Sequence, residues 1–329
     1  MAKAWTLQSR PSGTPTHDNF ALIDLPATAL AAGQIRIANR WLSVDPYMRG
    51  RMNDVKSYTP PFALGEPMQG GAVGQVTESS ADGFGPGDWV LHMAGWRDEA
   101  VLPATQVQKL PQLGVDPQAF LGQMGMPGMT AYFGLLEVAS AKPGDVVFVS
   151  AAAGAVGSTV VQIAKAKGMT VIGSAGGADK CAWVKSLGAD AVIDYKDGTP
   201  LIKQLAAAAP AGIDVYFDNV GGEHLDAALG LGNEHARFAI CGMINMYNTG
   251  APTELRYAPR IIGARMRIQG FIVSDYMSRA SEFYADMAGL LQAGKLVREE
   301  TVMHGLEATP DAFLGLFTGE NRGKMLVQL

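Results

Sequence analysis

The stretch that decides the fold is VVFVSAAAGAVGS, residues 146–158. Its first five residues are β-branched, aromatic or small, which is typical of a strand buried on both faces. Two glycines follow, Gly154 and Gly157, and a helical pattern then continues to Lys167. Backbone N–H groups at a helix N-terminus bind phosphate, and glycines let a ligand approach them closely. The order of strand, glycine turn and helix therefore predicts a site for the pyrophosphate of a dinucleotide.

Apolar runs and helical patterns alternate after this stretch. Strands are predicted at residues 170–173, 191–193, 213–217, 237–241 and 267–273, and helices at 156–167, 179–187, 200–208 and 223–229, with a last one ending at 291. Strands that alternate with helices at this spacing form parallel sheets covered on both sides. We therefore expect an α/β domain with a doubly wound parallel sheet (Rossmann) over residues 122–297.

The two ends of the chain have a different pattern. Residues 1–121 are rich in Gly and Pro and contain short strand patterns, for example at 34–39 and 72–77. Residues 298–329 hold a strand, a short helix and a terminal strand, which are too few to form a domain. We expect both ends, 1–121 and 298–329, to build one mostly β domain together.

Composition excludes several classes of function. The chain has 329 residues, 48% of them hydrophobic, and a net charge of −5. Its Lys and Arg residues form no cluster, so no nucleic-acid partner is expected. No apolar run reaches the roughly 18 residues of a membrane span, so no membrane association is expected. The first residues also lack a signal-peptide pattern, which predicts a cytoplasmic protein.

The end of the second predicted strand indicates which dinucleotide binds. NAD-specific sequences place an Asp or Glu there, where it bonds the ribose 2′-hydroxyl. This chain has VIGSAGG at residues 171–177, without a carboxylate, and Lys180 follows. A charge-assisted contact with a 2′-phosphate contributes about 1.5–3 kcal/mol. We therefore expect NADP(H), with Lys180 at the 2′-phosphate and the pyrophosphate at Gly154, Ala155, Val156 and Gly157.

Ligands for a metal ion are scarce. The chain has two cysteines, Cys181 and Cys241, both beside apolar residues, and five scattered histidines. No Cys-x-x-Cys or His-x-x-x-His spacing occurs, so no metal site and no disulfide are expected. We expect both cysteines to be buried as small hydrophobic side chains.

Several strings along the chain carry a family resemblance. They are DPYMR at 45–49, GMPGMTAY at 125–132, the glycine turn with its helix at 151–165, DNVGG at 218–222 and GENRGK at 319–324. On these strings the chain resembles the zinc-free branch of the medium-chain dehydrogenase/reductases, the prostaglandin reductases and alkenal double-bond reductases. The resemblance implies a GroES-like substrate domain beside the Rossmann domain. It also implies NADPH-dependent reduction of the C=C bond of α,β-unsaturated aldehydes and ketones.

The resemblance also implies further site residues. Tyr195 would join Lys180 at the phosphate end, and Asn321 would close over the cofactor. Asn219 would hold the cofactor at the carboxyl edge of the sheet. The nicotinamide end would be lined by Cys241, Gly242, Tyr247, Phe271, Ile272 and Val273. Tyr195 as a surface aromatic and Asn219 as a turn former are the alternatives.

To reduce an enone, the protein must position C4 of the nicotinamide against the β-carbon of the substrate. It must also stabilise the carbonyl oxygen, on which negative charge develops. Tyr47 and Tyr247 are the candidate donors, and the ribose hydroxyl of the cofactor is a third. Tyr47 can instead pack against the substrate. Gly71 and Gly263 stand where plant relatives carry tyrosines, which would remove bulk and a hydroxyl from the expected pocket.

Two other functions stay open. A quinone reductase of the same superfamily would share the fold and the cofactor, although the DPYMR string favours the alkenal branch. A non-catalytic NADPH-binding protein would keep the cofactor site alone. The expected partner is a small enone or enal. The edge strand 267–273 can also pair with its copy in a homodimer.

Overall fold

The computed structural model describes residues 1–250 and 252–329, which divide into two compact units. The first unit consists of Met1–Leu121 with Glu300–Leu329, and the second of Gly122–Glu299. Within the described residues, no helix is both long and apolar enough to cross a membrane.

The second unit is built on a six-stranded parallel sheet with the order β10-β9-β8-β11-β12-β13. Its strands are β8 (Val146–Val149), β9 (Thr170–Ala175), β10 (Ala191–Asp194), β11 (Ile213–Asp218), β12 (Gly232–Ile240) and β13 (Arg267–Gly270). The chain runs from β8 outwards to β10 and then returns to β11, on the other side of β8. The strand order therefore reverses between β8 and β11, and the prediction of a doubly wound parallel sheet is confirmed.

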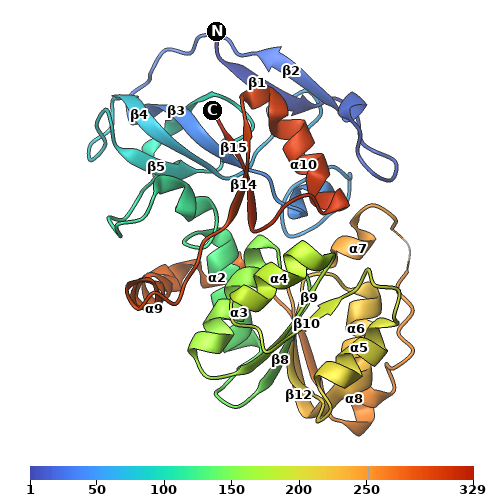
Figure 1. Ribbon diagram of the computed structural model, residues 1–329. Coiled ribbons are helices and arrows are strands. Elements are labelled where there is room, and N and C mark those ends of the chain that lie inside the picture. The colour runs from blue at the N-terminus through green and yellow to red at the C-terminus, as the bar shows by residue number, and fades with distance from the viewer. Residues whose placement is uncertain (251) are drawn as a thin grey trace. The chain divides into compact units, whose positions relative to one another are not determined.

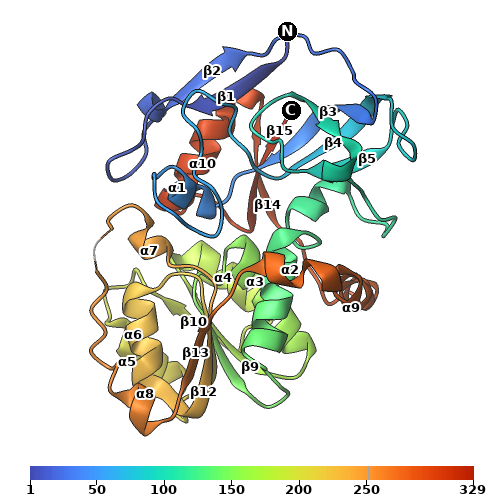
Figure 2. The same cartoon turned by 180° about the vertical axis from the view of Figure 1, so that it is seen from behind.

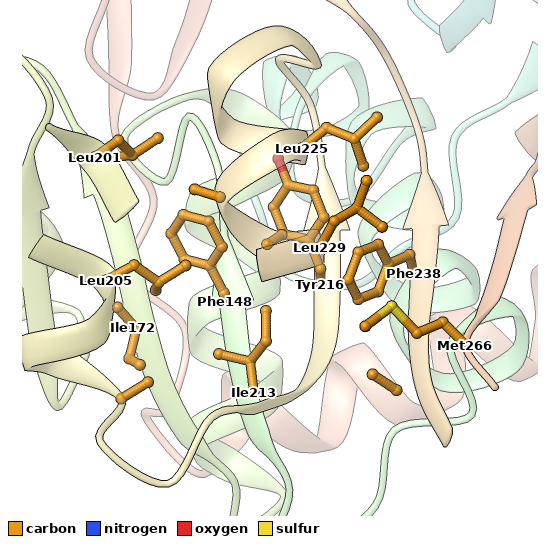
Figure 3. Close-up of a cluster of buried hydrophobic side chains, with 14 of the residues drawn as sticks. Phe148, Ile172, Leu201, Leu205, Ile213, Tyr216, Leu225, Leu229, Phe238 and Met266 are labelled. Carbon is orange, nitrogen blue, oxygen red and sulfur yellow. The ribbon is translucent and has the colours of Figure 1, made fainter. Parts of the chain in front are cut away.

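Helices cover both faces of this sheet (Figures 1 and 2). They are α2 (Met126–Phe133), α3 (Ala155–Ala166), α4 (Ala178–Ser186), α5 (Leu201–Ala208), α6 (Gly222–Leu231) and α9 (Ala280–Gln292). Leu205 of α5 and Leu229 of α6 lie with Phe148 of β8 in one buried cluster (Figure 3). Val147 and Val149 point to the opposite face of the same strand and are equally buried. Burial on both faces explains why residues 146–149 form an uninterrupted apolar run.

The first unit is mostly β, as predicted. Its larger sheet has the order β14-β15-β3-β4-β5-β7, and β6 also pairs with β3. The strands are β3 (Gln34–Ser43), β4 (Ala72–Ser79), β5 (Trp89–His92), β6 (Glu99–Pro103), β7 (Gln108–Lys109), β14 (Glu300–His304) and β15 (Lys324–Gln328), and β1 (Lys3–Leu7) and β2 (Phe20–Asp24) form a separate antiparallel pair. β15 pairs with β3, so the end of the chain completes a sheet begun near its start (Figure 1). The helix α10 (Thr309–Thr318) lies between β14 and β15 in the sequence.

The last strand of the parallel sheet is shorter than predicted. β13 ends at Gly270, whose pairing partner is Ile240, the last residue of β12. Beyond this point the neighbouring strand offers no further partner, so residues 271–273 leave the sheet although they are apolar. A 3-10 helix, η5 (Val273–Arg279), follows and leads into α9.

Candidate cofactor site

The glycine turn lies at the carboxyl edge of the parallel sheet, between β8 and α3, where the strand order reverses. Gly154 caps α3 with an extended backbone, and it has no side chain to bond the N–H groups of the first turn. A Cβ at Gly157 would clash with the carbonyl oxygen of Ala151 and lie 2.9 Å from its carbonyl carbon. Glycine at 157 thus allows the first turn of α3 to lie directly against the strand end. The arrangement offers backbone N–H groups to an anion.

Tyr195 and Lys196 directly follow β10 and lie against the turn after β9. A Cβ at Gly176 would lie 2.6 Å from the hydroxyl oxygen of Tyr195 and 2.9 Å from Cε of Lys196. Both side chains therefore cross the bare backbone of this glycine. Any larger residue at 176 would displace them.

Lys180 lies in the first turn of α4, where the helix dipole opposes a positive charge. Burial lowers the pKa of Lys180, and the positive charge of Lys196 lowers it further. Two cations held near one another, where β9 itself ends without an Asp or Glu, suit a dianion. Lys196 was not among the residues predicted from the sequence, although it directly follows Tyr195.

Two sets of contacts fix the shape of this region, one around Asp194 and a buried one around His224. Asp194 Oδ1 accepts hydrogen bonds from the N–H groups of Gly177 and Lys196, both at 2.9 Å, and these bonds lower the pKa of Asp194. Ser174 Oγ lies 3.0 Å from Nε2 of His224, whose ring meets Tyr195 edge-on at 5.5 Å between ring centres. Burial lowers the pKa of His224 to about 4, so this ring is neutral near pH 7. The neutral ring of His224 therefore packs against Tyr195 and adds no charge to the site.

Asn219 follows β11 at the same edge. Its backbone N–H donates to Oγ of Ser150 at 2.9 Å, and its side-chain Nδ2 donates to the carbonyl oxygen of Ser150 at 2.8 Å. Because Ser150 follows β8 and precedes the glycine turn, the orientation of Asn219 is set by the end of the neighbouring strand.

The loop after β12 lies against the start of α6. A Cβ at Gly222, whose φ is +54°, would clash with Nδ2 of Asn245. The N–H of Asn245 donates to the carbonyl oxygen of Val220 at 3.2 Å. Tyr247 closes the short helix α7 (Ile244–Tyr247), and its hydroxyl accepts a hydrogen bond from the N–H of Met243 at 3.3 Å. This loop therefore holds Tyr247 at the carboxyl edge.

Neither cysteine forms a disulfide, and both residues are partly buried, which is less burial than the sequence predicts. Burial of the thiol and the nearby Asp218 raise the pKa of Cys241 to about 12, which keeps this thiol protonated. Cys241 directly follows β12, and Cys181 is on α4.

The second unit contains every predicted cofactor residue except Asn321. All of them follow the carboxyl ends of parallel strands, where ligands bind in doubly wound sheets. Those after β8, β11, β12 and β13 are Gly154, Ala155, Val156, Gly157, Asn219, Cys241, Gly242, Tyr247, Phe271, Ile272 and Val273, and those after β9 and β10 are Lys180 and Tyr195.

Tyr47 belongs to the first unit and begins the short helix α1 (Tyr47–Arg51). Its hydroxyl oxygen is buried and finds no hydrogen-bond partner among the residues that the structure describes. Burial raises the pKa of Tyr47 well above its ordinary value, and the nearby Asp45 adds to this, whereas Arg51 opposes it. The phenol therefore stays protonated and is able to donate.

The other two predicted positions of the first unit are Asn321 and Gly71. Nδ2 of Asn321 donates to the carbonyl oxygen of Gly323 at 2.9 Å. A Cβ at Gly71 would lie 3.2 Å from Leu121, a tight contact that a tyrosine would make worse.

The expectation for Gly263 is wrong. This residue ends the short helix α8 (Arg260–Gly263), which precedes β13 and therefore lies at the amino edge of the parallel sheet. Figures 1 and 2 show α8 at the end of the second unit opposite α7. Because the cofactor residues lie at the carboxyl edge, the glycine at 263 removes nothing from their surroundings.

Two family models match the chain. The one described as the N-terminal domain of oxidoreductase matches residues 3–110, and the one described as zinc-binding dehydrogenase matches residues 155–292. In residues 1–250 and 252–329, no group of three or more His, Cys, Asp or Glu side chains is placed to hold a metal ion.

Relatives match over nearly the whole chain. The NADPH-dependent curcumin reductase of Escherichia coli is 41% identical over 337 residues, with 99% of this chain and 96% of the relative covered. The NADP(+)-dependent 2-alkenal reductase of Nicotiana tabacum is 42% identical over 301 residues, with 91% and 88% covered. The crystal structure of CurA from Vibrio vulnificus in complex with NADPH superposes with a TM-score of 0.94 at 44% identity, covering 99% of this chain and 98% of that one. The chain belongs to the medium-chain dehydrogenase/reductase family, in the branch of the prostaglandin reductases and alkenal reductases.

Proposed function

We propose that the chain is an NADPH-dependent reductase of the carbon–carbon double bond of small α,β-unsaturated aldehydes and ketones. The observation that carries the proposal is the glycine turn with the cation pair Lys180 and Lys196 at one sheet edge, in a chain 42% identical to a 2-alkenal reductase. When bound, NADPH supplies the hydride that attacks the β-carbon of the substrate.

The residues at the carboxyl edge fit NADPH. The N–H groups of the first turn of α3 bind the pyrophosphate, and Gly157 gives them their position against the strand. Lys180, Tyr195 and Lys196 bind the 2′-phosphate. β9 ends in Ser174 and Ala175, without the Asp or Glu that would bond a ribose 2′-hydroxyl. The carboxylate of Asp194 beside this turn is engaged by the N–H groups of Gly177 and Lys196. The loops after β12 and β13 hold the nicotinamide end.

The protein also has to stabilise negative charge on the carbonyl oxygen of the substrate. Tyr47 and Tyr247 are the proposed donors, since each carries a phenol and a hydrogen bond to the developing oxyanion lowers the barrier. The hydroxyl of Tyr47 meets no hydrogen-bond geometry with the described residues, and the guanidinium of Arg51 lies near it. The proton that the α-carbon receives comes from a phenol or from water.

Replacing Tyr47 with phenylalanine is expected to lower kcat/KM for an enone by about 10- to 100-fold. A positioned proton donor typically contributes about 100-fold or more, so the expected loss lies at or below the lower end of that range. The affinity for NADPH should not change. The melting temperature should stay equal or rise, because an unsatisfied buried hydroxyl destabilises a fold by about 1–3 kcal/mol. Steady-state kinetics and thermal melting of the purified variant measure both effects.

The same measurements on Tyr247→Phe decide which phenol acts, and Tyr257→Phe, a partly exposed tyrosine after α6, is the control. A Tyr47→Phe variant that keeps full activity would remove Tyr47 from the mechanism. A variant that loses activity and melting temperature together would point to a structural role instead.

The function itself is tested by NADPH oxidation with a panel of substrates. We expect turnover with 3-nonen-2-one and 4-hydroxynonenal, and much slower turnover with NADH. Higher kcat/KM for quinones than for enones would make the chain a quinone reductase. Binding of NADPH without turnover on any enone, quinone or nitroalkene would make it a non-catalytic binding protein.

The cytoplasmic location and the homodimer stay predictions. β13 lies at one edge of the parallel sheet and pairs, in the described part of the chain, with β12 alone. Its residues are exposed, so the outer edge is accessible to a second copy of the strand. Light scattering of the purified chain measures the subunit number directly.

A further inference from the structure

Asp218 ends β11 at the point where the strand order reverses, and its side chain is 0% exposed. Its Oδ1 oxygen is an acceptor for four groups: the hydroxyls of Tyr216 (2.7 Å) and Ser150 (3.2 Å) and the N–H groups of Val220 (2.9 Å) and Gly221 (2.8 Å). Its Oδ2 oxygen is buried and accepts no bond from the described residues. One carboxyl oxygen thus carries all the side-chain bonds of this residue.

These bonds connect two of the loops that form the cofactor site. Ser150 directly precedes the glycine turn, and Val220 and Gly221 lie in the loop before α6. The hydroxyl oxygen of Ser150 also accepts the N–H of Asn219, which closes a ring of contacts between Asp218, Ser150 and Asn219. This ring acts on the distance between the glycine turn and Asn219 together with the direct bond from Nδ2 of Asn219 to the carbonyl oxygen of Ser150.

The backbone of Asp218 reaches a third loop. Its carbonyl oxygen accepts the N–H groups of Cys241 at 2.9 Å and Gly242 at 3.1 Å. The loops after β8, β11 and β12 are consequently all bonded to one residue, two of them through its carboxylate.

A carboxylate in this position is unfavourable for the fold alone. Burial raises the pKa of Asp218, although the bonds from Gly221, Tyr216 and Val220 oppose this effect. Asp145, a buried carboxylate just before β8 at the opposite edge, has an ion pair with Arg237 at 2.6 Å. The bonds to the side chain of Asp218 come from neutral donors, which compensate the loss of hydration less well than a cation does.

We propose that Asp218 is the positioning residue of the cofactor site, whose Oδ1 sets the spacing between the glycine turn and the Asn219 loop. It acts through these loops and does not touch the cofactor. The inference rests on the proposed binding of NADPH. An acceptor oxygen at this position is required, whereas the negative charge is not.

The test compares Asp218→Ala with Asp218→Asn, which keeps an acceptor oxygen and places Nδ2 where Oδ2 now has no partner. We expect the Kd for NADPH, from fluorescence titration without substrate, to rise about 10-fold or more in Asp218→Ala and to stay within about threefold in Asp218→Asn, 10-fold being about 1.4 kcal/mol. Hydrogen exchange of the apoprotein should become faster at 151–157 and 219–222 together in Asp218→Ala.

Asp145→Asn is the matched control, since it alters a buried carboxylate of the same sheet at the opposite edge. It should lower the melting temperature and leave the Kd for NADPH within twofold. Where Asp218→Ala does not fold, Ser150→Ala opens the same ring without removing the carboxylate, and the same 10-fold rise is expected.

An unchanged NADPH Kd in folded Asp218→Ala or Ser150→Ala would overturn the inference. So would an equal loss of affinity in Asp145→Asn, which would show general destabilisation. Because these measurements use no substrate, failure of the wild type to reduce enones leaves them intact and refutes only the proposed reaction. The exchange experiment uses no cofactor, so it tests the coupling of the two loops even if NADPH does not bind.

Discussion

Replacing Gly157 with alanine is expected to raise the Kd for NADPH by about 100-fold, the largest effect of any single change at the site. The new Cβ would meet the carbonyl group of Ala151 and lie 2.9 Å from Cα of Ala152, and neither backbone atom moves easily. The first turn of α3 would have to shift away from the strand end. Loss of one or two of its hydrogen bonds to the charged pyrophosphate, at about 1.5–3 kcal/mol each, corresponds to a change of about that size. The crowding should also destabilise the fold by about 1–3 kcal/mol.

Variants at two further glycines distinguish an effect on NADPH affinity from an effect on the stability of the fold. A Cβ at Gly154 would lie 3.3 Å from the carbonyl oxygen of Ala151, so Gly154→Ala should weaken NADPH binding with little loss of stability. Gly289 on α9 has open space around it within the described structure, so Gly289→Ala should stabilise the helix by about 0.5–1 kcal/mol and leave binding unchanged. Fluorescence titration and chemical denaturation of the three variants measure this. Unaltered NADPH affinity in Gly157→Ala would refute the assignment of the turn.

Replacing Lys180 with alanine is expected to raise the Kd and the KM for NADPH by about 10- to 100-fold, since a charge-assisted bond to phosphate contributes about 1.5–3 kcal/mol. The values for NADH should change less than twofold because NADH has no 2′-phosphate. Removing Lys196 as well should weaken NADPH binding further, since the two cations lie near one another.

Lys185→Ala is the control for Lys180→Ala. Lys185 lies in the last turn of the same helix, is exposed, and donates to the carbonyl oxygen of Asp190 at 2.6 Å. Its removal should leave both cofactors unaffected. An equal loss of affinity for NADPH and NADH in Lys180→Ala would show that this lysine does not bind the 2′-phosphate.

The sequence was sufficient for the local features of the site. The glycine turn was predictable because the strand, the two glycines and the helix follow one another within residues 146–166. The position of Lys180 shortly after the end of β9 was predictable for the same reason, whereas its contact with a 2′-phosphate stays a prediction. Such features depend on short-range geometry that a pattern expresses directly.

Features that depend on the arrangement of strands were not predictable. The bond between Ser150 and Asp218 joins residues 68 positions apart, and no periodicity indicates it. Gly263 was wrongly expected in the pocket because the resemblance aligns residues along the sequence. It does not show at which edge of the sheet an aligned residue lies. Short helices such as α1 and α7 have only five and four residues, too few for a periodic pattern.

The account is tested most directly by following the hydride itself. The purified chain is incubated with 3-nonen-2-one and NADPH in which both hydrogens at C4 of the nicotinamide are replaced by deuterium, and the product is analysed by NMR. Hydride transfer to the β-carbon predicts a saturated ketone with deuterium at that carbon. Deuterium at the carbonyl carbon, in an unsaturated alcohol, would show carbonyl reduction instead, and a product without deuterium would contradict the proposed reaction altogether.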